Sequence, residues 1–153
     1  MSIEARLSEL GITLPQAAAP VASYVPVVIH GDLAYVSGQV SFVDGELLKG
    51  RLGEDVSLED GIEAARGCGL MILAQLKAAL GSLDRVGRVV KLGGFVNSTP
   101  DFTDQPKVVN GASDLMLEVF GEMGKHARAA VGAPSLPLGV AVEVDAVVAV
   151  KGE

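Results

Sequence analysis

The chain has 153 residues, of which 49% are apolar and 20% are charged, a composition that suits one folded domain with a buried core. Twelve Lys and Arg residues against nineteen Asp and Glu residues give a net charge of −7, which opposes binding to nucleic acid. A single cysteine, Cys68, excludes an intrachain disulfide framework and a cysteine-rich zinc site.

The apolar runs are far shorter than the roughly 20 residues that cross a bilayer. The first residues place Glu4 and Arg6 where a secretory signal needs an unbroken apolar stretch. With one cysteine in the chain, these patterns predict a protein of the reducing cytoplasm that does not bind membranes.

The first 20 residues predict a short helix followed by an extended arm. Ile3, Leu7 and Leu10 have helical spacing, and Gly11 follows as a stop, so residues 2–10 are expected to form an amphipathic helix. The next segment, 14–26, carries three prolines and is expected to be extended. Because too little chain precedes it to form a domain, we expect residues 1–20 to lie across a single domain spanning 1–153.

Residues 25–43 predict a β-hairpin that turns at Gly31-Asp32, since β-branched residues stand on both sides of the turn. A second reversal at Asp44-Gly45 leads into a short strand, Glu46 to Leu48.

A long helix is predicted over residues 57–80. Ser57 is a suitable N-cap, and Gly81 occupies the position of a C-terminal cap. Gly61, Gly67 and Gly69 within it each cost about 1 kcal/mol relative to alanine. Close packing of this helix on a sheet would explain them.

The second half predicts a strand over 86–96, weakened by Gly93-Gly94, and a helix from Pro106 to the stop at Gly121. Two more strands follow at 126–132 and 140–150. Because each helix is apolar on one face only, the economical packing is an α+β fold, one sheet with both helices on one face. The strand 140–150 is largely apolar on both faces, so we expect a second subunit to bury the other face.

The familiar catalytic motifs, such as a P-loop, HExxH or G-x-S-x-G, are absent from the sequence. His30 and His126 lack a clustered third ligand, so neither a metal nor a cofactor is expected. Cys68 lies mid-helix between two glycines and suits a buried packing thiol better than a nucleophile.

Arg128 and Glu143 lie at equal distances from Ser135-Leu136, so an antiparallel pairing of the last two strands would place them opposite each other. A guanidinium binds a carboxylate through a planar fork, and a neighbouring carboxylate can orient a water molecule. The pair is therefore either a ligand site or a simple cross-strand ion pair. Tyr24, in the irregular segment before the first strand, is free to line a cleft.

Several stretches together resemble the RidA/YjgF family, whose members are also labelled endoribonuclease L-PSP or chorismate-mutase-like. The resemblance extends from about residue 20 to 150 and is carried by Ser23-Tyr24-Val25, Val36-Ser37-Gly38-Gln39, Arg85 to Val96, Ala127-Arg128, Leu136-Pro137 and Val142-Glu143-Val144-Asp145-Ala146.

This resemblance implies a homotrimer of chorismate-mutase-like subunits, with a central barrel of sheets and ligand clefts between subunits. It implies hydrolysis of reactive 2-imino and enamine acids to 2-oxo acids and ammonia, without a cofactor. By the family pattern Arg128 binds the substrate carboxylate, Glu143 lies near the imine and the attacking water, and Tyr24 and Gly38 approach the ligand.

The sequence departs from the family pattern at a few positions. Ala130 stands where the family often has cysteine, and the loop over 98–107 is longer than usual. The helical residue that faces the cleft is Asn110 by one alignment and Ser113 by another. These differences keep two other functions open, a trimer that binds a carboxylate ligand without turnover, and an endoribonuclease, which the negative charge opposes.

Overall fold

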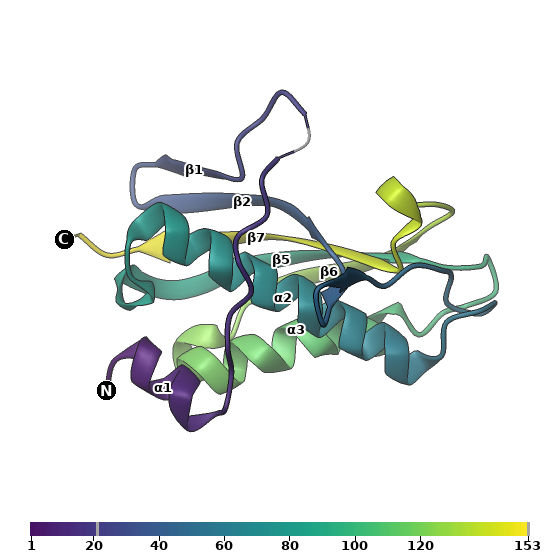
Figure 1. Cartoon of the computed structure of the whole chain (residues 1–153), viewed down its shortest axis with the longest axis horizontal. Coiled ribbons are helices and arrows are strands. Elements are labelled where there is room, and N and C mark those ends of the chain that lie inside the picture. Colours follow the sequence, from purple (N-terminus) through teal and green to yellow (C-terminus); the bar gives the residue numbers. More distant parts are fainter. Residues whose placement is uncertain (21, 153) are drawn as a thin grey trace.

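Five strands form one mixed sheet in the order β1-β2-β7-β5-β6 (Figure 1). The computed structural model describes residues 1–20 and 22–152. Neighbouring strands are antiparallel except for β5 and β6, which are parallel. The bounds of the strands are Val27–His30 (β1), Leu33–Val40 (β2), Val86–Asn97 (β5), Ala127–Ala133 (β6) and Val142–Val150 (β7). A separate small hairpin pairs β3 (Phe42–Val43) with β4 (Glu46–Leu47).

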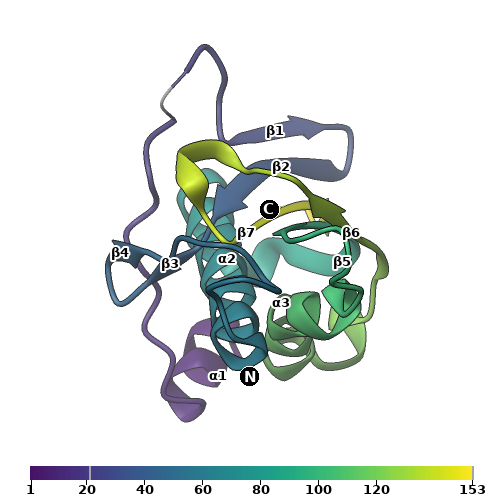
Figure 2. The same ribbon diagram turned by 90° about the vertical axis from the view of Figure 1, so that its right-hand side faces the viewer.

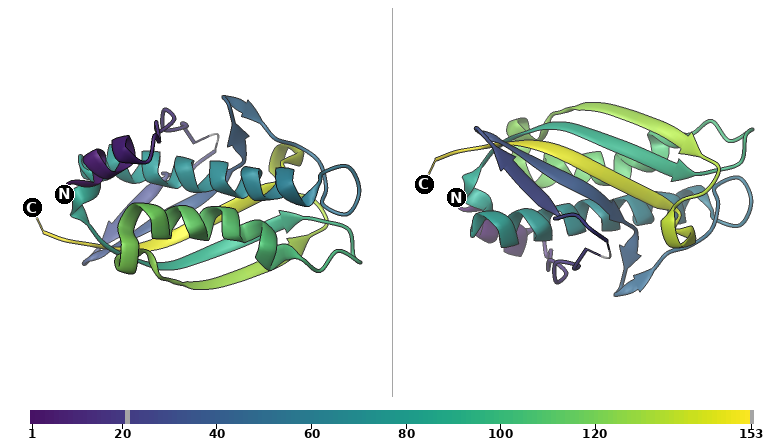
Figure 3. Two further views of the ribbon diagram at one scale, coloured as in Figure 1. Left: turned by 90° about the horizontal axis from the view of Figure 1, so that it is seen from below. Right: turned by 90° about the horizontal axis from the view of Figure 1, so that it is seen from above.

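Two long helices, α2 (Leu58–Leu80) and α3 (Gln105–Phe120), lie side by side on one face of this sheet (Figures 2 and 3). Ser57 caps α2 by accepting a hydrogen bond from the Asp60 N–H, and Gly81 ends it in the left-handed conformation. The core lies between helices and sheet and includes Ile72, Leu76, Leu115, Val144 and Val148, all nearly inaccessible to solvent. The α+β fold with both helices on one face is thereby confirmed.

The predicted N-terminal helix is present as α1 (Ile3–Glu9), and short 3-10 turns occur at Leu83–Arg85, Gly121–Gly124 and Pro137–Gly139. After α1, residues 12–20 form an extended arm that crosses α2 (Figure 1). The arm is extended, as its prolines predicted, and it lies across the body of the fold. Within the described residues, no helix is long and apolar enough to cross a membrane.

The predicted hairpin of the last two strands is wrong. β6 is an edge strand that pairs only with β5, whereas β7 lies in the middle of the sheet between β2 and β5. The connection between them passes over one strand and includes Leu138 at a φ of 61°. Mirror-related spacing about Ser135-Leu136 cannot distinguish this connection from a tight turn.

The glycines of α2 do mark close contacts, but only one of them faces a strand. A Cβ at Gly67 would overlap the Phe42 carbonyl group of β3. At Gly61 and Gly69 the nearest obstacles are the side chains of Leu52 and Leu115. β5 also runs unbroken through Gly93-Gly94, because these glycines leave space for side chains from β7 and α3.

Gly67→Ala should destabilise the fold more than Gly61→Ala does. The new Cβ at residue 67 meets a backbone carbonyl that cannot move alone, which costs roughly 1–3 kcal/mol of unfolding free energy. At residue 61 it meets the end of a leucine side chain, and a gain in helix propensity of about 1 kcal/mol offsets the crowding. Urea unfolding of both variants measures the difference, and equal losses would contradict the packing described here.

Candidate functional site

The first candidate cluster is a pocket of about 450 Å³ beside Glu143 on β7. Its lining includes Tyr24, Gly38, Gln39 and Gln75. Ser37 and Gly38 lie where the register between β2 and β7 shifts, and a Cβ at Gly38 would overlap the Glu143 carboxylate. Glycine at residue 38 therefore makes room for this carboxylate, and three of the predicted site residues, Tyr24, Gly38 and Glu143, come together.

The Glu143 carboxylate is held in an environment that disfavours its charge. Partial burial raises the pKa of Glu143, and the nearby Asp145 carboxylate raises it further. Burial also raises the pKa of Asp145, against the opposing effects of the Gly93 N–H and the Lys91 ammonium. A carboxylate with a raised pKa beside a pocket is a better proton acceptor than an ordinary glutamate.

The second cluster surrounds Arg128 on the edge strand β6. Arg128 Nη1 donates to Asn110 Oδ1 at 2.8 Å and to Ser113 Oγ at 3.1 Å, and Nη2 donates to the Pro106 carbonyl at 3.3 Å. All three partners belong to α3. Both helical candidates, Asn110 and Ser113, therefore accept a hydrogen bond from Arg128, so both residues belong to this cluster.

These contacts leave one edge of the guanidinium open. Both hydrogens of Nη1 and one of Nη2 are donated to α3. Nε and Nη2 together form the other edge of the group, and within the described residues no hydrogen bond to a protein acceptor uses the Nε hydrogen or the second hydrogen of Nη2. This edge is the planar fork that a carboxylate matches with two parallel hydrogen bonds.

The two clusters do not meet within one chain. Arg128 pairs with Leu92 and Glu143 pairs with Phe95, in a stretch of β5 without a register shift. Because residues 92 and 95 are an odd number apart, their side chains stand on opposite faces of the sheet. The interpretation as a cross-strand ion pair is therefore wrong, and the predicted juxtaposition within one chain fails with it.

Comparison with known proteins places this fold and its residues in a family. A family model described as "YjgF/chorismate mutase-like, putative endoribonuclease" matches residues 4–148. The chain belongs to the YjgF/RidA family. The family resemblance drawn from the sequence is thereby confirmed.

Relatives of this YjgF/RidA chain cover nearly its whole length. It is 55% identical to the protein TCP17 of Trypanosoma cruzi over 148 residues, which are 95% of this chain and 92% of that protein. The crystal structure of Atu1372 from Agrobacterium tumefaciens, a protein of unknown function, is 51% identical with a TM-score of 0.90 and covers 97% of this chain and 92% of that one. RidA from the Antarctic bacterium Psychrobacter is 28% identical with a TM-score of 0.61, covering 90% and 98%.

Some residues at the two clusters escaped the sequence analysis. His126 Nδ1 lies 2.6 Å from the Gly124 carbonyl oxygen and must donate to it, so in the neutral ring Nε2 accepts from the Ser113 hydroxyl at 2.8 Å. Ser113 Oγ is then oriented to accept from Arg128. At the other cluster, Gln75 is 3% exposed on the core side of α2. A glutamine among the apolar residues of the core face of a helix could have indicated this buried polar contact from the sequence alone.

The structure places Cys68 in the core. Cys68 is fully buried, its thiol donates to the Val142 carbonyl at 3.4 Å, and burial raises its pKa, as a packing thiol requires. Among residues 1–20 and 22–152 no group of three His, Cys, Asp or Glu side chains is arranged to hold a metal ion.

Asp145→Asn should lower the pKa of Glu143. The native pKa of Glu143 lies above the value of about 4.3 expected in the unfolded chain, so the native state holds this proton more tightly. Its stabilising effect is present at low pH and is lost as the pH rises through the native pKa. Without the Asp145 charge, less stability is lost as the pH rises, and only the part of the raised pKa that is caused by burial remains. Carboxyl-carbon NMR titration measures the pKa, and Asp114→Asn on the exposed side of α3 is the control. An unchanged Glu143 titration in Asp145→Asn would contradict the coupling.

Proposed function

We propose that this protein hydrolyses reactive 2-imino acids and their enamine tautomers to 2-oxo acids and ammonia, in clefts between the subunits of a homotrimer. The observation that carries the proposal is the edge of the Arg128 guanidinium formed by Nε and Nη2, which keeps two hydrogens for a ligand while α3 accepts the other three. Such an edge suits the carboxylate that every 2-imino acid carries.

In this reaction the protein has mainly to position the imine and the attacking water molecule. A protonated imine is already electrophilic, so a correctly placed water molecule can attack its carbon. Glu143 would take a proton from that water while the C=N electron pair moves to nitrogen, giving a carbinolamine. The Glu143 carboxyl then returns the proton to the amino nitrogen. Ammonia leaves as the carbinolamine hydroxyl becomes the carbonyl group of the 2-oxo acid, and the hydroxyl proton passes to solvent.

A neighbouring subunit is needed because Arg128 and Glu143 stand on opposite faces of the sheet in one chain. The face without helices (Figure 3, right) carries exposed apolar side chains, among them Val28, Tyr35 and Val131, each with about half of its surface accessible. Covering this face with other copies would remove apolar surface from water, which stabilises an assembly. A cleft between copies would then have the Arg128 cluster on one wall and the Glu143 pocket on the other.

The endoribonuclease activity named in the family description receives less support from this chain. Its net charge is −7, and the pocket holds Glu143 with Asp145 close by. Both features repel the phosphates of RNA.

Arg128→Lys should lower turnover of 2-iminopropionate by about thirty- to a thousand-fold in kcat/KM. The ammonium cannot reproduce the planar fork, and losing a charge-assisted contact of this kind costs roughly 2–4 kcal/mol. Glu143→Gln should preserve binding of pyruvate and depress kcat, because the amide keeps the shape and loses the basic oxygen. The imine is generated in situ with an amino-acid oxidase, and release of 2-oxo acid is followed with and without each variant.

Each variant is first shown by light scattering to have the same mass as the wild type. A wild-type mass near 15.7 kDa would remove the clefts between subunits and the proposal with them. Equal turnover in the wild type and both variants would contradict the assigned roles. Pyruvate binding that depends on Arg128, without any acceleration of imine hydrolysis, would support the carboxylate-binding protein instead.

A further inference from the structure

One wall of the Glu143 pocket comes from the N-terminal arm. Ala18, Ala19 and Pro20 of the arm line the pocket, together with Phe42, Leu138 and residues of the sheet. We refer to residues 18–20 as the arm wall. The pocket volume of about 450 Å³ is in the range of about 300–1,000 Å³ that small-molecule sites occupy.

The arm wall is fixed in place at its inner side. The buried amide of Gln75 donates from Nε2 to the Ala18 carbonyl at 2.7 Å, and it also reaches Gln39 Oε1 at 3.4 Å. Gln39 Nε2 in turn donates to the Ser37 carbonyl at 2.9 Å. This chain of amides connects the arm to α2 and to β2 at the irregular stretch that contains Gly38.

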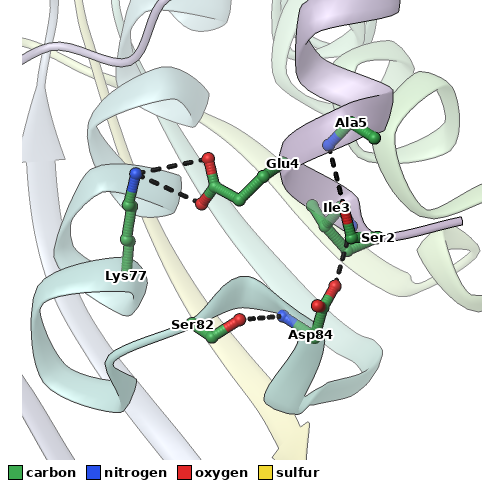
Figure 4. Close-up of polar contacts among 7 residues, drawn as sticks. All are labelled: Ser2, Ile3, Glu4, Ala5, Lys77, Ser82 and Asp84. Carbon is green, nitrogen blue, oxygen red and sulfur yellow. Dashed lines mark hydrogen bonds and ion pairs between the residues drawn. The ribbon is translucent and has the colours of Figure 1, made fainter.

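The start of the arm is anchored as well, through α1. The Ile3 N–H donates to Asp84 Oδ1 at 2.7 Å, and Glu4 pairs with Lys77 of α2 at 3.2 Å (Figure 4). Arg6 Nε donates to the Glu118 carbonyl of α3 at 3.0 Å, and Leu7 is buried in the core. With α1 anchored before the wall and Ala18 bonded to Gln75 at the wall, the arm is held against the pocket at residue 18.

The lining of this pocket offers little to a charged substrate side chain. Among the described residues that line it there is no Lys, Arg or His, and Glu143 is the one charged group. Both amide hydrogens of Gln75 and one of the two amide hydrogens of Gln39 are already donated within the protein. The arm wall, Pro26, Phe42 and Leu138 present carbon, so an apolar side chain gains most by entering.

We infer that the arm wall gives the enzyme a preference for 2-imino acids with branched or aromatic apolar side chains. The inference rests on the proposed function, because it takes Glu143 as the group beside the reacting carbon. The substrate carboxylate remains with the Arg128 cluster, and the side chain extends from the reacting carbon toward residues 18–20.

The test compares two imines that differ only in their side chain, 2-imino-4-methylpentanoate and 2-iminopropionate. Wild type should favour the larger imine in kcat/KM by at least about tenfold, since added methyl and methylene groups in an apolar pocket give this order of discrimination. Ala18→Phe and Ala19→Phe narrow the pocket from the arm wall and should reduce this ratio about tenfold or more. The matched control is Gln16→Phe, an exposed position of the same arm outside the lining, which should leave the ratio unchanged.

A wild-type ratio of one or less overturns the inference without any variant. The inference also fails if the ratio of the two kcat/KM values is the same in Ala18→Phe, Ala19→Phe and Gln16→Phe. If neither imine is turned over, the proposed function fails. Calorimetric titration with 4-methyl-2-oxopentanoate and pyruvate then tests, without turnover, whether the arm wall favours the larger apolar side chain. Tighter binding of the larger 2-oxo acid, lost in Ala18→Phe and kept in Gln16→Phe, supports the wall. Equal or absent binding of the two acids overturns it.

Discussion

The alternation of side chains along β5 separates the two chemical groups of this protein. Arg128 shares a face of the sheet with Leu92, and Glu143 shares the opposite face with Phe95. No side-chain rotation moves a residue through a hydrogen-bonded sheet, so the two groups cannot meet within one chain. In the proposed function, each chain therefore carries two halves of a site that neighbouring copies complete. The assembly that we propose follows from this constraint, because only a second copy can bring a guanidinium to the carboxylate.

In each cluster, neighbouring residues orient the functional side chain before a ligand binds. α3 supplies all three acceptors that orient Arg128, and the Ser113 hydroxyl is itself oriented by His126. Ordering a long arginine side chain costs conformational entropy, so contacts made in advance reduce the cost of binding a ligand. On the other half, Gly38 provides the space for Glu143, and Asp145 together with partial burial keeps its proton affinity high.

Local patterns predicted most of the fold. The spacing of apolar residues and the caps Ser57 and Gly81 gave α2 within one residue at its start, and the Gly31-Asp32 turn placed the first hairpin. These features depend on neighbours a few residues apart. The order of strands depends on contacts between distant segments, and here the sequence analysis failed, because β6 reaches β7 by passing over β5.

The sequence analysis named candidate site residues but did not predict how they are arranged. Tyr24, Gly38, Asn110, Arg128 and Glu143 do fall into two clusters, but their separation could not be derived without the pairing of β5. The Ser113–His126 contact joins a helix to the segment before a strand, 13 residues apart, and no periodicity reveals it. The arm wall was equally hidden, since an extended, proline-containing segment predicts neither where it lies nor what it lines.

Mixing two defective variants tests most directly whether the two halves meet between chains. Arg128→Lys and Glu143→Gln subunits are unfolded together in equal amounts and refolded, and imine turnover is compared with each variant refolded alone. A cleft that takes Arg128 from one subunit and Glu143 from another is intact in about a quarter of random pairings, so the mixture should regain about a quarter of wild-type activity. If the mixture instead shows only the average of the two variants, both residues act within one chain or not at all, and the central claim is wrong.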